Sequence, residues 1–105
     1  MQMLWLKELP KEIIGSVFET SIFAELVKRY GQDSIFYWRT KDKKEIDFIL
    51  RIKNNILPIE AKLNFEQFNP NAVRYFNKKY GIKKYKVAGL KGELKNRAYV
   101  YPWEI

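Results

Sequence analysis

The chain has 105 residues, 47% of them hydrophobic and 30% charged, which is the composition of a single folded domain. A formal net charge of +8 favours an anionic partner, with nucleic acid ahead of a membrane surface. Because cysteine and histidine are both absent, disulfides, thiolate zinc sites, cysteine nucleophiles and histidine acid–base chemistry are excluded, and any bound metal should be a hard ion such as Mg²⁺ or Mn²⁺.

Residues 1–14 form an apolar N-terminal segment, whose apolar residues are Leu4, Trp5, Leu6, Leu9, Ile13 and Ile14. Pro10 limits any helix here to a short one on either side. Two interpretations stay open: the segment packs on the core of its own domain, or it docks onto a partner such as an ATPase domain. No apolar run reaches membrane-spanning length and no secretory signal pattern occurs, so we expect a cytoplasmic protein without a membrane partner.

A helix is predicted from Gly15-Ser16 to about Tyr30, because Ser16 is a good N-cap and Gly31 is a good residue to end a helix. Glu19 lies three residues after Ser16, which is the spacing of a capping box. Glu19 also falls inside the apolar stripe of this helix, where a lone carboxylate is costly to bury. It is therefore either a cap or an acid that points at the sheet, and the sequence leaves both alternatives open.

Residues 34–40 are β-branched and aromatic and predict a strand, while residues 44–63 predict a hairpin of two alternating strands around Asn54-Asn55. Alternation on the first strand of this hairpin puts its apolar residues on one face, and these are Ile46, Phe48, Leu50 and Ile52.

A two-residue loop at Asn54-Asn55 would pair Asp47 with Lys62 and Ile49 with Glu60. Asp47, Glu60 and Lys62 then gather on one face of the sheet, since cross-strand partners share a face. Such a cluster is either an exposed salt bridge or, held on rigid strands beneath a helix, the start of a divalent-metal site.

After the hairpin, Pro70 predicts the start of a second helix that runs to Gly81, and residues 84–90 and 98–101 predict two more strands. The order is therefore helix, three strands, helix, strand, strand. The first three strands are expected to be antiparallel, and the second helix then allows a parallel strand to be added. We expect an α/β fold with a mixed central sheet flanked by helices.

An Asp on one strand followed by Glu-x-Lys on the next resembles the PD-(D/E)XK nuclease superfamily. More closely, from Gly15 to Gly92 the chain is similar to the nuclease-like C-terminal domain, of unknown function, of archaeal and bacterial AAA+-type ATPases. The resemblance implies a restriction-endonuclease-like domain over residues 15–105. Unlike those ATPases, the sequence contains no Gly-rich phosphate-binding loop. The blocks that carry the resemblance are Gly15-Ser16-Val17-Phe18-Glu19, Phe36-Tyr37-Trp38-Arg39, Glu45-Ile46-Asp47-Phe48 and Pro58-Ile59-Glu60-Ala61-Lys62.

The resemblance implies hydrolysis of DNA phosphodiester bonds that depends on Mg²⁺ or Mn²⁺, with Glu19, Asp47, Glu60 and Lys62 as the catalytic residues. Asp47, Glu60, the backbone carbonyl of Ala61 and Glu19 would hold the metal, and Lys62 would orient or activate the water. Phosphates would be contacted by Arg39, Lys41, Lys43, Lys44 and Lys53. The alternatives are a nuclease-fold DNA-binding module that serves an ATPase without cutting, and a protein-interaction domain. The oligomeric state stays open, a homodimer included.

Overall fold

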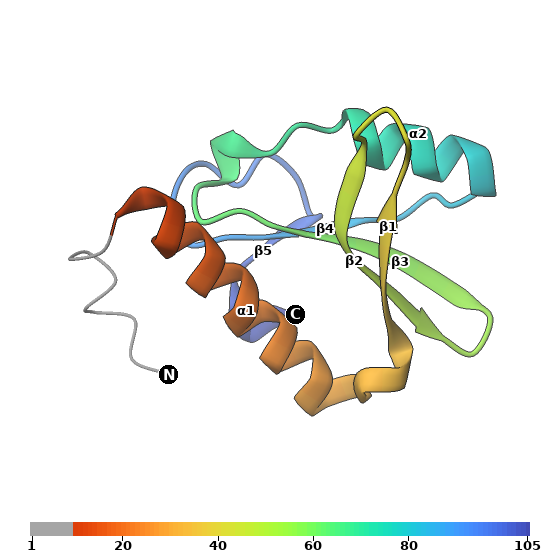
Figure 1. Ribbon diagram of the computed structural model, residues 1–105, viewed down its shortest axis with the longest axis horizontal. Helices are drawn as coiled ribbons and strands as arrows, with labels where there is room; N and C mark the ends of the chain where they lie inside the picture. Colours follow the sequence, from red (N-terminus) through yellow and green to blue (C-terminus); the bar gives the residue numbers. More distant parts are fainter. Residues whose placement is uncertain (1–9) are drawn as a thin grey trace.

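The computed structural model describes residues 10–105 (Figure 1). The predicted packing or docking of Leu4, Trp5, Leu6 and Leu9 therefore lies outside the described residues. The helices are α1 (Lys11–Tyr30) and α2 (Asn71–Tyr80), with short 3-10 helices η2 (Gln32–Ser34), η3 (Phe65–Gln67) and η4 (Pro102–Glu104); the strands are β1 (Ile35–Arg39), β2 (Glu45–Ile52), β3 (Asn55–Ala61), β4 (Lys86–Ala88) and β5 (Tyr99–Val100).

The strands form one sheet in the order β1-β2-β3-β4-β5. β2 is antiparallel to both of its neighbours, β1 and β3, whereas β4 lies parallel to β3 and β5 lies parallel to β4. The crossover through α2 is what allows β3 and β4 to run in the same direction. The predicted α/β class, the mixed sheet and the order of elements are confirmed.

The two helices pack on separate cores, one for each face of the sheet (Figure 1). Phe18, Ile22 and Leu26 of α1 belong to a core that includes Phe48 and Ile59 from the sheet. On the other face, Val73 and Phe76 of α2 share a core with Ile46 and Ile49 of β2. Burial of apolar surface on both faces fixes the central strands between the helices.

Helix α1 begins at Lys11, with Pro10 at the N-cap, so the predicted start at Gly15-Ser16 is wrong. Proline is tolerated at the start of a helix because the N–H that it lacks would have no partner there. Gly15 lies inside the helix at an exposed position, and packing does not require a glycine there because a Cβ would meet nothing within 4 Å. The boundary expected after residue 14 falls inside α1, whereas the predicted end at Gly31 is confirmed, with its N–H 2.8 Å from the Val27 carbonyl.

The hairpin turn lies at Lys53-Asn54 and not at Asn54-Asn55, because Ile52 pairs with Asn55. Lys53 takes the positive φ of 57° that the turn requires. The predicted register is therefore wrong by two residues. Because side chains alternate with period two, an even shift leaves every residue on its predicted face.

A β-bulge in β2 does change the faces. Phe36 pairs with Ile49 and Trp38 pairs with Ile46, so two residues of β2, Asp47 and Phe48, lie opposite one residue of β1. Ile46 consequently packs in the α2-side core while Phe48 packs in the α1-side core. The expectation that Ile46 and Phe48 share a face is wrong, and the residue displaced at the bulge is Asp47.

Candidate active site at the ends of β2 and β3

Asp47 and Glu60 link β2 to β3 through their side chains. The backbone N–H of Asp47 donates to Glu60 Oε1 at 3.0 Å, and the backbone N–H of Ala61 donates to Asp47 Oδ2 at 2.8 Å. The regular backbone pairing between β2 and β3 ends at the pair Phe48 and Ile59. Beyond that pair, the two carboxylates accept the backbone N–H groups of the neighbouring strand.

Lys62 contacts both acids. Its Nζ lies 3.9 Å from Asp47 Oδ2 and 3.7 Å from Glu60 Oε2. The acids are the more buried members, since their side chains expose 15% and 7% of their surface against 33% for Lys62. The backbone N–H of Lys62 donates to the Ala88 carbonyl at 2.9 Å, which fixes the lysine beside the end of β4. The sequence prediction that Asp47, Glu60 and Lys62 converge agrees with this geometry.

Burial makes both carboxylates hard to ionise. Burial and then the charge of Asp47 raise the pKa of Glu60 to about 7, and Lys62 opposes this shift. Burial also raises the pKa of Asp47, against the bond from the Ala61 N–H and the charge of Lys62. Close acids with raised pKa values are typical of sites that bind a cation or move a proton.

Glu19 projects from α1 toward the same cluster. Its pKa is raised, first by its partial burial and then by the charge of Asp47, while Lys62 lowers it. Ser16 lies inside α1 and Pro10 is the N-cap, so the capping-box alternative for Glu19 is wrong. The other alternative, an acid directed at the sheet, agrees with the electrostatic coupling of Glu19 to Asp47.

The acids open into two separate hollows. Asp47 and Glu19 line one of about 380 Å³, together with Tyr37 and Arg39. Glu60 lines another, of about 350 Å³, whose other residues include Lys43, Lys44, Lys62, Asn69 and Asn71. We expected one face covered by α1, whereas the acids meet between two strands and are exposed on different sides. The bulge at Asp47 is the physical reason, because it turns that side chain toward α1.

Four of the five predicted phosphate contacts lie near this end of the sheet. Arg39 ends β1, and its Nη2 lies 3.6 Å from Glu45 Oε2, a pair too exposed to hold the side chain firmly. Lys41 and Lys43 are exposed in the turn that follows. Lys44 pairs with Asp42 and lies 5.1 Å from the centre of the Tyr75 ring.

The fifth predicted contact, Lys53, is not brought to the site. It lies in the turn at the far end of β2, six residues from Asp47, which corresponds to about 20 Å along a strand. Glu45 is the residue that sequence reasoning missed, since its charge raises the pKa of both Asp47 and Glu19. The spacing Glu45-x-Asp47, which places alternate residues of a strand together, was the available signal.

The donor chemistry of this cluster suits a hard divalent cation, because carboxylate and carbonyl oxygens are the ligands that Mg²⁺ prefers. The arrangement provides a pair of acids and not a full set. Across residues 10–105, no group of three or more Asp, Glu, His or Cys side chains is positioned to hold a metal. A cation at this site would therefore have Asp47 and Glu60 as its carboxylate ligands, and backbone oxygens or water would have to complete its shell.

Fold and site together define a small α/β domain that carries a buried acid pair and a lysine at a break between two antiparallel strands. The chain belongs to the family described as "Domain of unknown function (DUF4143)", whose model matches residues 14–104. No curated protein and no solved structure matches the chain at a significant level. None of the helices within the described residues has the length and apolar character needed to cross a membrane.

Proposed function

We propose that this protein is a nuclease-like domain with a PD-(D/E)XK core that hydrolyses DNA phosphodiester bonds with the help of Mg²⁺ or Mn²⁺. The observation that carries the proposal is the contact of Lys62 with both Asp47 and Glu60, two buried acids on adjacent strands. The resemblance of these residues to the Asp and Glu-x-Lys of that superfamily supports the same assignment.

In this proposal the site residues have three roles, which are to bind the metal, to orient the water and to bind the phosphates. Asp47, Glu60 and the Ala61 carbonyl would hold the cation, and Glu19 would bind a second ion or a water beside the first. A bound Mg²⁺ supplies charge neutralisation at the phosphate and makes water a stronger nucleophile. Lys62 orients that water and stabilises the negative charge that develops on the phosphoryl oxygens. Arg39, Lys41 and Lys43 would bind the flanking phosphates.

A second candidate is a nuclease-fold module that binds DNA, or a partner ATPase, without cutting. The observation that favours it is that Asp47 and Glu60 both find hydrogen-bond and ion-pair partners within the protein itself. Asp47 accepts a backbone N–H, Glu60 accepts another, and Lys62 lies within ion-pair distance of both carboxylates. A cluster of this kind holds β2 and β3 together whether or not a metal binds.

Incubation of labelled single-stranded, duplex and four-way-junction DNA with the protein and either metal separates the two candidates. We expect wild-type protein to cut, and Glu60→Gln to cut at least about a hundredfold more slowly while binding DNA almost normally, because Glu60 would contact the metal and not the phosphate. Glu93→Gln removes the same charge from an exposed residue elsewhere and should leave cutting unchanged. Wild-type protein that binds DNA but cuts none of these substrates with either metal would establish the second candidate.

A further inference from the structure

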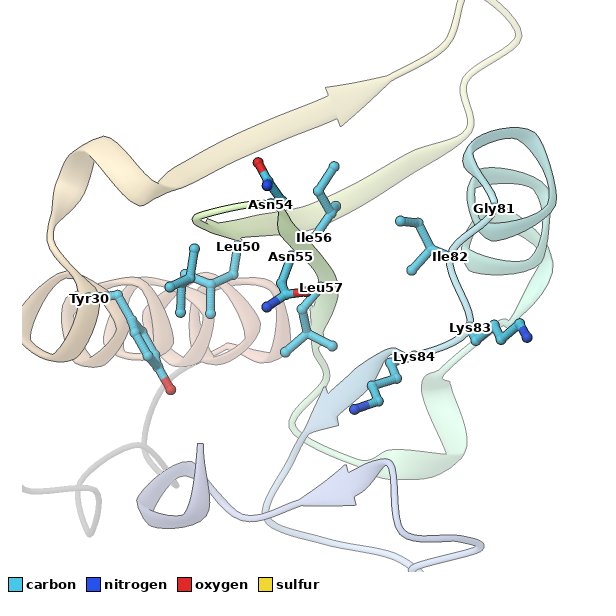
Figure 2. Close-up of a pocket in the computed structure, with 11 residues that line it drawn as sticks. Tyr30, Leu50, Asn54, Asn55, Ile56, Leu57, Gly81, Ile82, Lys83 and Lys84 are labelled. Atoms are coloured by element: carbon cyan, nitrogen blue, oxygen red, sulfur yellow. The ribbon is translucent and has the colours of Figure 1, made fainter.

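A second concave surface lies at the opposite end of β2, away from Asp47. Two adjoining hollows, of about 590 and 460 Å³, share Leu57, Lys83 and Lys84. We call their combined lining the hairpin groove. Figure 2 shows the larger hollow between the β2–β3 hairpin, which carries Asn54 and Asn55, and the chain segment that leaves α2.

The groove exists because β3 and β4 pair over only part of their length. β4 begins at Lys86 opposite Ile59, so among the described strands β2 alone pairs with the first residues of β3. The connection between α2 and β4, residues 81–85, forms hydrogen bonds with α2 instead. Asn77 Nδ2 donates to the Lys84 carbonyl at 3.2 Å, and the Ile82 N–H donates to the Asn77 carbonyl at 2.9 Å. These bonds hold the connection apart from β3 and keep the groove open.

The charged residues that line the groove are all cations, and no acid of residues 10–105 lies among them. Lys83 and Lys84 line both hollows, and Lys86 and Arg97 line the smaller one. None of these four side chains forms an ion pair with a described residue. The surrounding sequence has the same bias: residues 67–92 contain no Asp or Glu and carry Arg74, Lys78, Lys79, Lys83, Lys84, Lys86 and Lys91.

The floor of the groove is apolar. This floor lies across the edge of β3, with Tyr30, Leu50 and Leu57 on the α1 side and Ile56 and Ile82 on the α2 side, and Asn54 and Asn55 border it at the turn. In Figure 2, the side chains of Lys83 and Lys84 point to opposite sides of the connection, as successive residues of an extended segment do. Lys84 and Lys86 then lie on the same side, about 7 Å apart along the chain, which is comparable with the spacing of neighbouring phosphates in an extended strand.

We propose that the hairpin groove binds single-stranded nucleic acid. The lysines and Arg97 would contact successive phosphates, while the bases cover the apolar floor and the Asn54 and Asn55 amides meet their polar edges. A single strand fits this lining better than a duplex does, because only an unpaired strand offers its bases to an apolar surface. The inference does not depend on whether Asp47 and Glu60 cut, since the two surfaces share no residue.

Fluorescence anisotropy with a labelled twelve-nucleotide thymidine strand tests the proposal. Lys83→Gln/Lys84→Gln removes two charges from the groove, and Lys91→Gln/Lys95→Gln removes two from exposed residues that lie outside both hollows. We expect the groove pair to weaken binding roughly tenfold and to flatten the salt dependence by about 1.4 in log–log slope, and the control pair to change affinity by less than about twofold. Circular dichroism should show the same fold for all proteins.

Three competitors test whether binding depends on the bases, on a single strand and on nucleic acid as the source of the negative charge. An abasic strand of the same length and charge should bind several-fold more weakly than the thymidine strand, because it leaves the apolar floor uncovered. A twelve-base-pair duplex and a polyglutamate of equal charge should also compete poorly. Equal losses in both variant pairs, equal binding of the abasic strand, or equal competition by duplex or polyglutamate would overturn the proposal.

Discussion

Glu60 is the most deeply buried charged residue within residues 12–105, with 5% of the surface of the whole residue exposed. A buried carboxylate is expensive to ionise unless a cation or several hydrogen bonds compensate it. Lys62 and the Asp47 N–H compensate only in part, because burial and Asp47 still raise the pKa of Glu60 to about 7. Stability without metal should therefore depend on pH through this residue.

The sign of that dependence follows from the folded and unfolded pKa values. Since the pKa of Glu60 rises from 4.5 to about 7 on folding, the folded chain holds more protons between these values, and the free energy of unfolding falls as pH rises from about 4.5 to 7. Urea denaturation in a chelator should show wild-type protein less stable at pH 8 than at pH 5. Glu60→Gln should reduce this difference by on the order of 2 kcal/mol. An identical pH profile in wild type and variant would contradict the assignment of the shift to Glu60.

At the scale of elements, the ends of β3 and β4 are held together by close backbone contact near the site. A Cβ added to Gly89 would lie 2.6 Å from the Lys62 carbonyl oxygen and 2.8 Å from the Phe65 ring. The backbone carbonyl cannot yield without moving the chain that carries Lys62. The position of Lys62 thus depends on Gly89, the residue that directly follows β4.

Gly89→Ala should therefore destabilise the domain by about 1–3 kcal/mol, since the added methyl group overpacks the junction. Gly15→Ala is the matched control, because it adds the same methyl group to open space in a helix and should stabilise by about 0.5–1 kcal/mol. Thermal melting should move in opposite directions for the two variants, by several degrees for each kcal/mol in a domain of this size. A Gly89→Ala protein as stable as wild type would show that β3 and β4 are less closely apposed.

The hairpin also shows what sequence patterns predict and what they do not. Alternation and the Glu60-Ala61-Lys62 block predicted two adjacent strands that bring Asp47, Glu60 and Lys62 together. The exact pairing could not follow from alternation, because an even register shift buries the same side chains. The bulge at Asp47 carries no distinct signal, since Ile46, Phe48 and Leu50 are all buried on either reading. The start of α1 was missed because the glycine that suggested a boundary lies on an exposed face.

Over the whole molecule, the acids of the candidate site lie at one end of the sheet, and the hairpin groove lies at the other. Glu19, Glu45, Asp47 and Glu60 gather where β2 and β3 separate, whereas every charged residue among the described residues that line the hairpin groove is a cation. With a net charge of +8, the domain can bind a polyanion while keeping an acidic site for a metal. A nucleic-acid strand bound in the hairpin groove would be held by the cations there, away from the acids of the candidate site.

Binding to single-stranded DNA should consequently weaken steeply with salt. Four phosphate contacts, from Lys83, Lys84, Lys86 and Arg97, predict a log–log slope of about −2.8, because each contact with a single strand contributes about −0.7. Anisotropy titrations between 50 and 200 mM salt, over which the Debye length falls by about half, measure this slope directly. An affinity that does not change with salt would argue against nucleic acid as the partner.

Metal binding at Asp47 and Glu60 tests the central claim most directly, because hydrolysis of the proposed kind needs a cation at these acids. Electron paramagnetic resonance of free Mn²⁺ measures the bound fraction without requiring a substrate. We expect wild-type protein and Glu93→Gln to bind Mn²⁺ equally, and Asp47→Asn and Glu60→Gln to bind at least about tenfold more weakly. Wild-type protein that binds no Mn²⁺, or four proteins that bind it alike, would contradict a metal-dependent nuclease at this site.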